Sequence, residues 1–126
     1  MKKIVMFDDD SSLTNLAEYV FTSAGYSIHT SNDPQYLKEV ILEHEPDLIL
    51  MDIVMPNIDG AEAVKILQAD DKMKHIPVIF LTALISGKEE ELKDLGIKVS
   101  GHKYAVMSKP FDIYKLVEKV KQMIGA

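Results

Sequence analysis

Residues 47–51 read Asp-Leu-Ile-Leu-Met, and Asp52 follows them directly. A short, uninterrupted apolar run that ends at a polar residue is typical of a β-strand buried on both faces. Residues 4–7 and 78–81 have the same character, and residues 27–30 and 104–107 are two further predicted strands. Because strands buried on both faces are typical of parallel sheets, we expect five parallel strands.

The stretches between these strands are predicted to be amphipathic helices. Apolar residues recur at the spacing of a buried helix face over residues 13–21, and a similar spacing recurs over residues 113–124. Asp33-Pro34 is a start signal for the second helix, and Gly25 and Gly125 stand where helices are expected to end. The expected buried positions are Leu13, Leu16, Ala17, Val20 and Phe21, then Leu37, Val40 and Ile41, and finally Ile113, Leu116, Val117, Val120 and Ile124.

Strands that alternate with helices predict an α/β fold, here a five-stranded parallel sheet covered on both faces as a (βα)5 three-layer sandwich. A chain of 126 residues is expected to form one domain, residues 1–126.

No apolar run approaches the roughly 20 residues of a membrane span. The net charge of −6 disfavours binding to nucleic acid, and the lack of cysteine excludes disulfides and thiolate chemistry. We therefore expect a cytoplasmic, stand-alone domain.

Polar residues stand at the ends of the predicted strands. Carboxyl ends of parallel strands meet at one edge of the sheet, so these side chains are expected to converge. Gathered carboxylates repel one another unless a cation joins them, and oxygen ligands without histidine or cysteine favour Mg²⁺ or Mn²⁺. A lysine and a hydroxyl beside them suit a phosphoryl group that a carboxylate oxygen attacks. The residues are Asp8, Asp9 and Asp10 after the first strand, Asp52 after the third, Thr82 after the fourth and Lys109 after the fifth.

Four motifs in order make the chain resemble a response-regulator receiver domain, the CheY-like family of two-component signalling. They are Asp8-Asp9, the segment Met-Asp-Ile-Val-Met-Pro-Asn-Ile-Asp-Gly at residues 51–60, Leu81-Thr82-Ala83, and Lys109-Pro110-Phe111. The resemblance covers essentially the whole chain. It implies the flavodoxin-like sheet with strand order 2-1-3-4-5.

The resemblance also implies a role for each site residue. Asp52 corresponds to the phosphoacceptor, Thr82 to the switch hydroxyl and Lys109 to the ion-pairing lysine, whose bond to Pro110 is usually cis in the family. The implied ligands of Mg²⁺ are Asp8, Asp9, Asp52 and the backbone carbonyl of Val54. Two features depart from the family pattern. Val106 replaces a frequent aromatic residue, with Tyr104 on the same strand face, and the segment from Thr82 to Lys109 is longer, with the excess expected at residues 97–103.

The function that this implies is a single-domain response regulator. A histidine kinase or phosphotransfer protein would phosphorylate Asp52, and the fourth and fifth βα units would contact a downstream protein, without direct nucleic-acid or membrane binding. Its own chemistry would be limited to Mg-dependent self-phosphorylation and autodephosphorylation, so it is not expected to be an enzyme.

Three alternatives remain at this point. One is a haloacid-dehalogenase-like phosphatase that uses Asp8 and Asp10. Another is a flavodoxin-like cofactor binder, whose bound phosphate the three aspartates would repel. The last is a receiver that acts without phosphorylation.

Asp10 also suits a helix cap. The four histidines share no spacing, which predicts surface positions and no zinc site.

Overall fold

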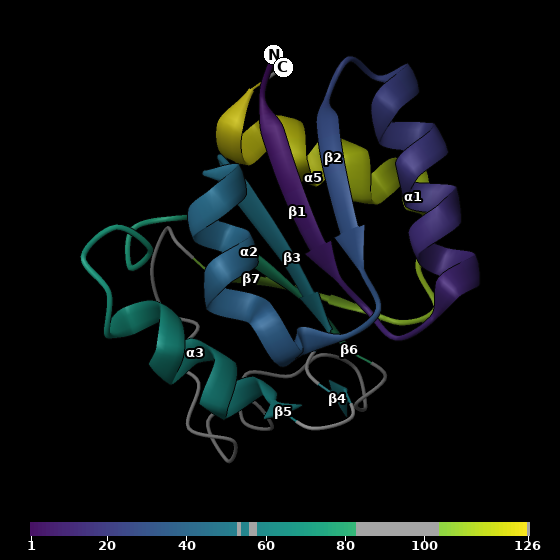
Figure 1. Ribbon diagram of the computed structural model, residues 1–126. Helices are drawn as coiled ribbons and strands as arrows, with labels where there is room; N and C mark the ends of the chain where they lie inside the picture. Colours follow the sequence, from purple (N-terminus) through teal and green to yellow (C-terminus); the bar gives the residue numbers. More distant parts are fainter. Residues whose placement is uncertain (53, 56–57, 83–103, 126) are drawn as a thin grey trace.

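The computed structural model describes residues 1–52, 54–55, 58–82 and 104–125, and it has the expected α/β architecture (Figure 1). The main sheet is parallel throughout, and its strands lie in the order β2-β1-β3-β6-β7, which confirms the predicted order 2-1-3-4-5. These strands are β1 (Lys3–Phe7), β2 (Ser27–Ser31), β3 (Leu48–Asp52), β6 (Val78–Thr82) and β7 (Tyr104–Ser108). Each agrees with its prediction to within one residue at either end.

The helices and the remaining short elements connect these strands. They are α1 (Ser11–Ser23), the 3₁₀ helix η1 (Pro34–Tyr36), α2 (Leu37–His44), α3 (Gly60–Gln68) and α5 (Ile113–Ile124), with β4 (Val54–Met55) and β5 (Ile58–Asp59) paired as a small antiparallel sheet. The predicted fourth helix falls on residues outside the described part of the chain. Among the described residues, no helix is both long and apolar enough to cross a bilayer.

The central strands β1, β3 and β6 are apolar on both faces, because helices cover each face of the sheet. Successive strand residues point to opposite faces, so Ile49 and Met51 pack in the layer of α2 and α3, and Leu48 and Leu50 pack in the layer of α1 and α5. All four are fully buried. Figure 1 shows α1 and α5 on one side of the sheet and α2 and α3 on the other. The predicted three-layer sandwich is therefore confirmed.

Helix α1 has the predicted signals at both ends. The Asp10 carboxylate accepts hydrogen bonds from the N–H groups of Ser12 and Leu13, so Asp10 caps the helix as expected. After the helix, Gly25 adopts φ +94°, a conformation that favours glycine. Its N–H donates to the Thr22 carbonyl while the N–H of Tyr26 donates to the Phe21 carbonyl, and these two bonds form a Schellman motif.

Two details of the helix predictions are wrong. Asp33-Pro34 does not open an α-helix directly: the Asp33 carboxylate accepts from the N–H of Gln35, residues 34–36 form η1, and α2 begins at Leu37. Leu16 is 46% exposed, whereas Thr14 is buried at 2%. The buried stripe of α1 is therefore rotated toward Thr14, whose hydroxyl donates to the Ser11 carbonyl and so tolerates burial.

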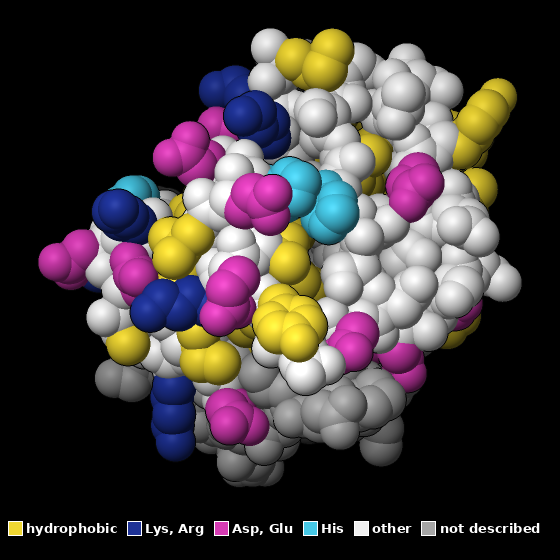
Figure 2. Space-filling view, in the orientation of Figure 1, with side chains coloured by type: hydrophobic (Ala, Val, Ile, Leu, Met, Phe, Trp, Pro, Cys, Tyr) yellow, Lys and Arg dark blue, Asp and Glu magenta, His cyan; other side chains and the backbone are white. Residues whose placement is uncertain are grey.

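A stacked histidine pair, which no sequence pattern predicts, lies between the edge strand β2 and the end of α2. The rings of His29 and His44 lie 4.1 Å apart between centroids with an angle of 18° between their planes. Figure 2 shows two adjoining histidine side chains, in cyan, on this face of the molecule. Partial burial and then the positive charge of His44 lower the pKa of His29, and the carboxylates of Glu43 and Glu18 oppose that shift.

We predict that two leucine-to-alanine substitutions on helices will differ sharply in their effect on stability. Leu116 on α5 is fully buried, so L116A should lower the free energy of unfolding by about 2 to 5 kcal/mol. L16A removes the same atoms from a side chain that is half exposed, so its cost should stay below about 1 kcal/mol. Urea denaturation of both variants measures this, and equal losses would contradict the assigned orientation of α1.

The histidine pair predicts a dependence of stability on pH. Because the pKa of His29 is lower in the folded state, the unfolded chain binds more protons, and stability falls as the pH falls through the ordinary histidine pKa of about 6.5. H29Q should therefore lose less stability than the wild type between neutral pH and pH about 5.5. Urea midpoints across this range measure the effect, with H75Q at an exposed position as control. Parallel curves for wild type and H29Q would refute the prediction.

Candidate functional site

The register of the sheet brings two buried aspartates together. Phe7 pairs with Met51 in neighbouring parallel strands, and one further step along both strands sets Asp8 beside Asp52. Asp8 is fully buried and Asp52 is 4% exposed, whereas Asp9 is exposed. One carboxylate oxygen from each of these three residues lies within 4.8 Å of the other two. The predicted convergence of Asp8, Asp9 and Asp52 is therefore present in the structure.

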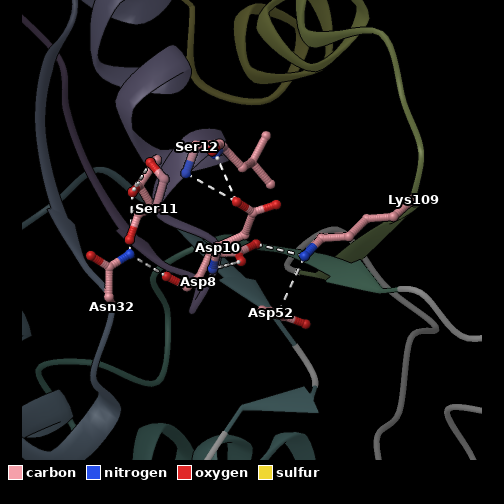
Figure 3. A network of polar contacts seen from close by, with 9 residues as sticks. Asp8, Asp10, Ser11, Ser12, Asn32, Asp52 and Lys109 are labelled. Carbon is pink, nitrogen blue, oxygen red and sulfur yellow. Dashed lines mark hydrogen bonds and ion pairs between the residues drawn. The ribbon is translucent and has the colours of Figure 1, made fainter.

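Lys109 reaches this cluster from the far side of β6. Two strand spacings of about 4.8 Å each separate β7 from β3, so only a long side chain beyond the end of β7 can reach Asp52. The Lys109 Nζ lies 2.8 Å from Asp8 Oδ2 and 3.2 Å from Asp52 Oδ2, and Figure 3 shows the ammonium between the two carboxylates. The bond from Lys109 to Pro110 is cis, as the resemblance implies.

The surroundings of Lys109 keep it charged. Burial by itself lowers the pKa of Lys109. The hydrogen bond that its ammonium donates to Asp8 and the negative charges of Asp52 and Asp8 outweigh burial, so this pKa lies above its ordinary value. The ammonium is thus a permanent positive charge at neutral pH. One ammonium faces three carboxylates, which leaves an excess of negative charge in the cluster.

The loop between β1 and α1 holds its aspartates in different ways. Asp8 Oδ1 accepts the N–H of Asp10 at 2.9 Å, while Asp8 Oδ2 is paired with Lys109. Asp10 uses its own carboxylate to cap α1. A phosphatase mechanism that relies on Asp8 and Asp10 needs that carboxylate at the reaction centre, so the geometry offers no support for this alternative.

Asn32 is a residue of this network that sequence reasoning missed. It follows β2 directly, and its side-chain amide donates to the Asp8 carbonyl at 2.7 Å and to the Thr14 hydroxyl at 3.2 Å. The N–H of Asp8 donates to the carbonyl of Ser31, the residue that precedes Asn32. A single asparagine after an edge strand carries no recognisable pattern, so only the strand pairing reveals this contact.

Thr82 and Val54 are placed in the structure by their backbones alone. Thr82 is the last residue of β6, in register with Ser108 of β7, and Val54 begins β4. Both positions adjoin the carboxyl edge of the sheet, and both side chains are outside the described part of the structure. Val106 packs against the α2 and α3 side of the core. The side chain of Tyr104 and residues 97–103 likewise fall outside the description.

The donor set suits a hard divalent cation. Three carboxylates offer only oxygen ligands, and their excess negative charge favours binding of a small ion such as Mg²⁺ or Mn²⁺. Within the described residues, this is the one cluster of at least three acidic or histidine groups close enough to share an ion. The residues present therefore fit the metal that the resemblance implies.

Comparisons with known proteins agree with this geometry. The family model of the response regulator receiver domain matches residues 4–121. The polar-differentiation response regulator DivK of Brucella anthropi is 38% identical over 128 aligned residues, which cover 99% of this chain and 98% of that protein. DivK of Brucella ovis is 34% identical, with 99% and 98% covered.

Solved structures give the same picture. The chemotaxis response regulator CheY4 of Vibrio cholerae has a TM-score of 0.82 at 26% identity, with 98% of each chain covered. The receiver domain of a sensor histidine kinase from Pseudomonas aeruginosa PAO1, which has a magnesium ion coordinated in its active-site cleft, has a TM-score of 0.81 at 24% identity, with 99% and 98% covered. At this identity the second likeness concerns the fold, and together they confirm the flavodoxin-like arrangement.

Proposed function

Because the chain belongs to the response regulator receiver domain family, we propose that residues 1–126 act as one receiver unit that is phosphorylated on Asp52 in a cytoplasmic two-component pathway. The donor is a histidine kinase or a phosphotransfer protein. The observation that carries the proposal is the buried Asp52 carboxylate, which lies beside two further carboxylates and the Lys109 ammonium. Receivers are phosphorylation switches and not typical enzymes.

The chemistry is a phosphoryl transfer to a carboxylate. An oxygen of Asp52 forms a bond to phosphorus while the bond from phosphorus to the donor's imidazole nitrogen breaks, and the imidazole leaves with that electron pair. Burial of Asp52 at the strand end limits the access of water to this carboxylate. The Lys109 ammonium, already 3.2 Å from Asp52, is placed to pair with an oxygen of the incoming phosphoryl group.

The negative charge of the cluster creates the need for a cation. A phosphoryl group adds further negative charge beside Asp8, Asp9 and Asp52, and one lysine cannot balance all of it. When bound there, Mg²⁺ or Mn²⁺ in its place would supply positive charge to offset that of the phosphoryl oxygens. Asp8, Asp9 and Asp52 would hold it, with the backbone carbonyl of Val54 as the ligand that the family resemblance adds.

Output is proposed to run through the fourth and fifth βα units. Thr82 ends β6 next to β7 in register, so its hydroxyl would respond to the phosphoryl group at the carboxyl edge of the sheet. Movement there would change the surface presented to a downstream protein. No direct contact with nucleic acid or membrane is proposed, and the chain's own chemistry is limited to its phosphorylation and dephosphorylation.

We predict that incubation with acetyl phosphate and Mg²⁺ adds one phosphoryl group to the wild-type protein. D52N should abolish the gain in intact mass because it removes the nucleophile, and excess EDTA should prevent it. D10N is the matched control, since Asp10 caps α1 outside the cluster, and it should still gain the group. A gain that survives in D52N would overturn the proposal, and repeated turnover of an aryl phosphate would favour the phosphatase alternative.

We also predict that D9A weakens Mg²⁺ binding much more than D10A. Asp9 offers an oxygen within 4.8 Å of Asp8 and Asp52, whereas the Asp10 carboxylate bonds to the first turn of α1. The loss in D9A should be at least about tenfold, or about 1.4 kcal/mol. Calorimetric titration at neutral pH and low salt measures both affinities. Equal affinities in the two variants would remove Asp9 from the ligand set.

A further inference from the structure

Asn32 contacts the loop between β1 and α1, which holds Asp8, Asp9 and Asp10 and is called the acidic loop below. Asn32 itself lies outside the carboxylate cluster. Its amide donates to the backbone carbonyl of Asp8 at 2.7 Å, and Figure 3 shows that it approaches from the side opposite Lys109. The same amide donates to the hydroxyl of Thr14, a side chain only 2% exposed. Because Thr14 in turn donates to the carbonyl of Ser11, Asn32 links the end of β2 to both the acidic loop and the first turn of α1.

The Asp8 carbonyl belongs to the peptide unit that leads into Asp9. A peptide unit is planar, so the direction of its carbonyl also fixes the direction in which the chain enters the next residue. The N–H of Asp8 is held by the carbonyl of Ser31 at 3.1 Å, and the carbonyl of Asp8 is held by Asn32. Consecutive residues at the end of β2 therefore fix the main chain on both sides of Asp8.

The three carboxylates of the cluster depend to different degrees on these two hydrogen bonds to the main chain of Asp8. Asp8 is fully buried, with one oxygen on the N–H of Asp10 and the other on Lys109, and Asp52 is fixed at the end of the central strand β3. Asp9 is exposed, so packing does not set the position of its side chain. The orientation of its main chain therefore has a direct effect on where its carboxylate lies.

We propose that Asn32 is a positioning residue for the metal site, which acts through the peptide unit between Asp8 and Asp9 and keeps the Asp9 carboxylate directed at the cluster. The inference rests on the proposed function, because it assumes that the cluster binds Mg²⁺. Partners of metal ligands commonly contribute about 10- to 100-fold to metal affinity by fixing the ligands in place. Asn32 contributes in this way although it lies on another strand and touches no carboxylate of the cluster.

The test compares N32A with N15A, a matched loss of an exposed asparagine on α1. N32A should raise the dissociation constant for Mg²⁺ by about 10- to 100-fold, and N15A should leave it unchanged. Calorimetric titration measures both, and urea denaturation in EDTA shows that each variant is folded. If the wild type binds Mg²⁺ and N32A binds it equally well, the inference is wrong.

A second measurement on the metal-free protein tests the route through Asp9. The ¹⁵N order parameter of the Asp9 amide should be near about 0.85 in the wild type and fall below about 0.6 in N32A, while the amide of Asp112 at the start of α5 stays unchanged. A weaker affinity with a rigid Asp9 amide would refute the positioning role. If the wild type fails to bind Mg²⁺, the proposed function fails, and the order parameter still decides whether Asn32 holds the loop.

Discussion

The interaction on which the site depends is the Lys109 ammonium between the carboxylates of Asp8 and Asp52. Two buried carboxylates at neighbouring strand ends repel each other, and burial makes that repulsion stronger than in water. The positive charge of Lys109 offsets this repulsion, but one ammonium does not neutralise three carboxylates. In the proposed function, a divalent cation and a phosphoryl group would balance each other's charge at this cluster.

The fold explains why these residues meet although they are distant in sequence. Parallel pairing of β1 with β3 sets Asp8 next to Asp52, and the position of β6 between β3 and β7 requires the length of a lysine. The helices on both faces bury the central strands, and the burial extends to Asp8 and Asp52 at their carboxyl ends. Beyond β2, Asn32 extends the network to the main chain of the acidic loop. The strand pairing that builds the sheet thus also brings together the charged side chains at its edge.

The sequence predicted what local patterns encode. The apolar runs located the strands, the spacing of Ile113 to Val120 located the buried face of α5, and Asp10 was identified as a cap, because each depends on neighbours in the chain. Leu16 was placed wrongly, since its spacing fits a buried stripe and only the packing of Thr14 decides the rotation of α1. Asn32 and the pair His29–His44 could not be predicted, because they arise from contacts of an edge strand with distant elements.

The most direct test of the account locates the phosphoryl group. Protein treated with acetyl phosphate and Mg²⁺ is reduced with borohydride, which converts an aspartyl phosphate to homoserine, and is then digested and sequenced by mass spectrometry. The account predicts homoserine at position 52 alone, since Asp8 is held by Lys109 and the N–H of Asp10 while Asp9 is proposed as a ligand of the cation. Homoserine at position 8 or 9, with Asp52 intact, would contradict it.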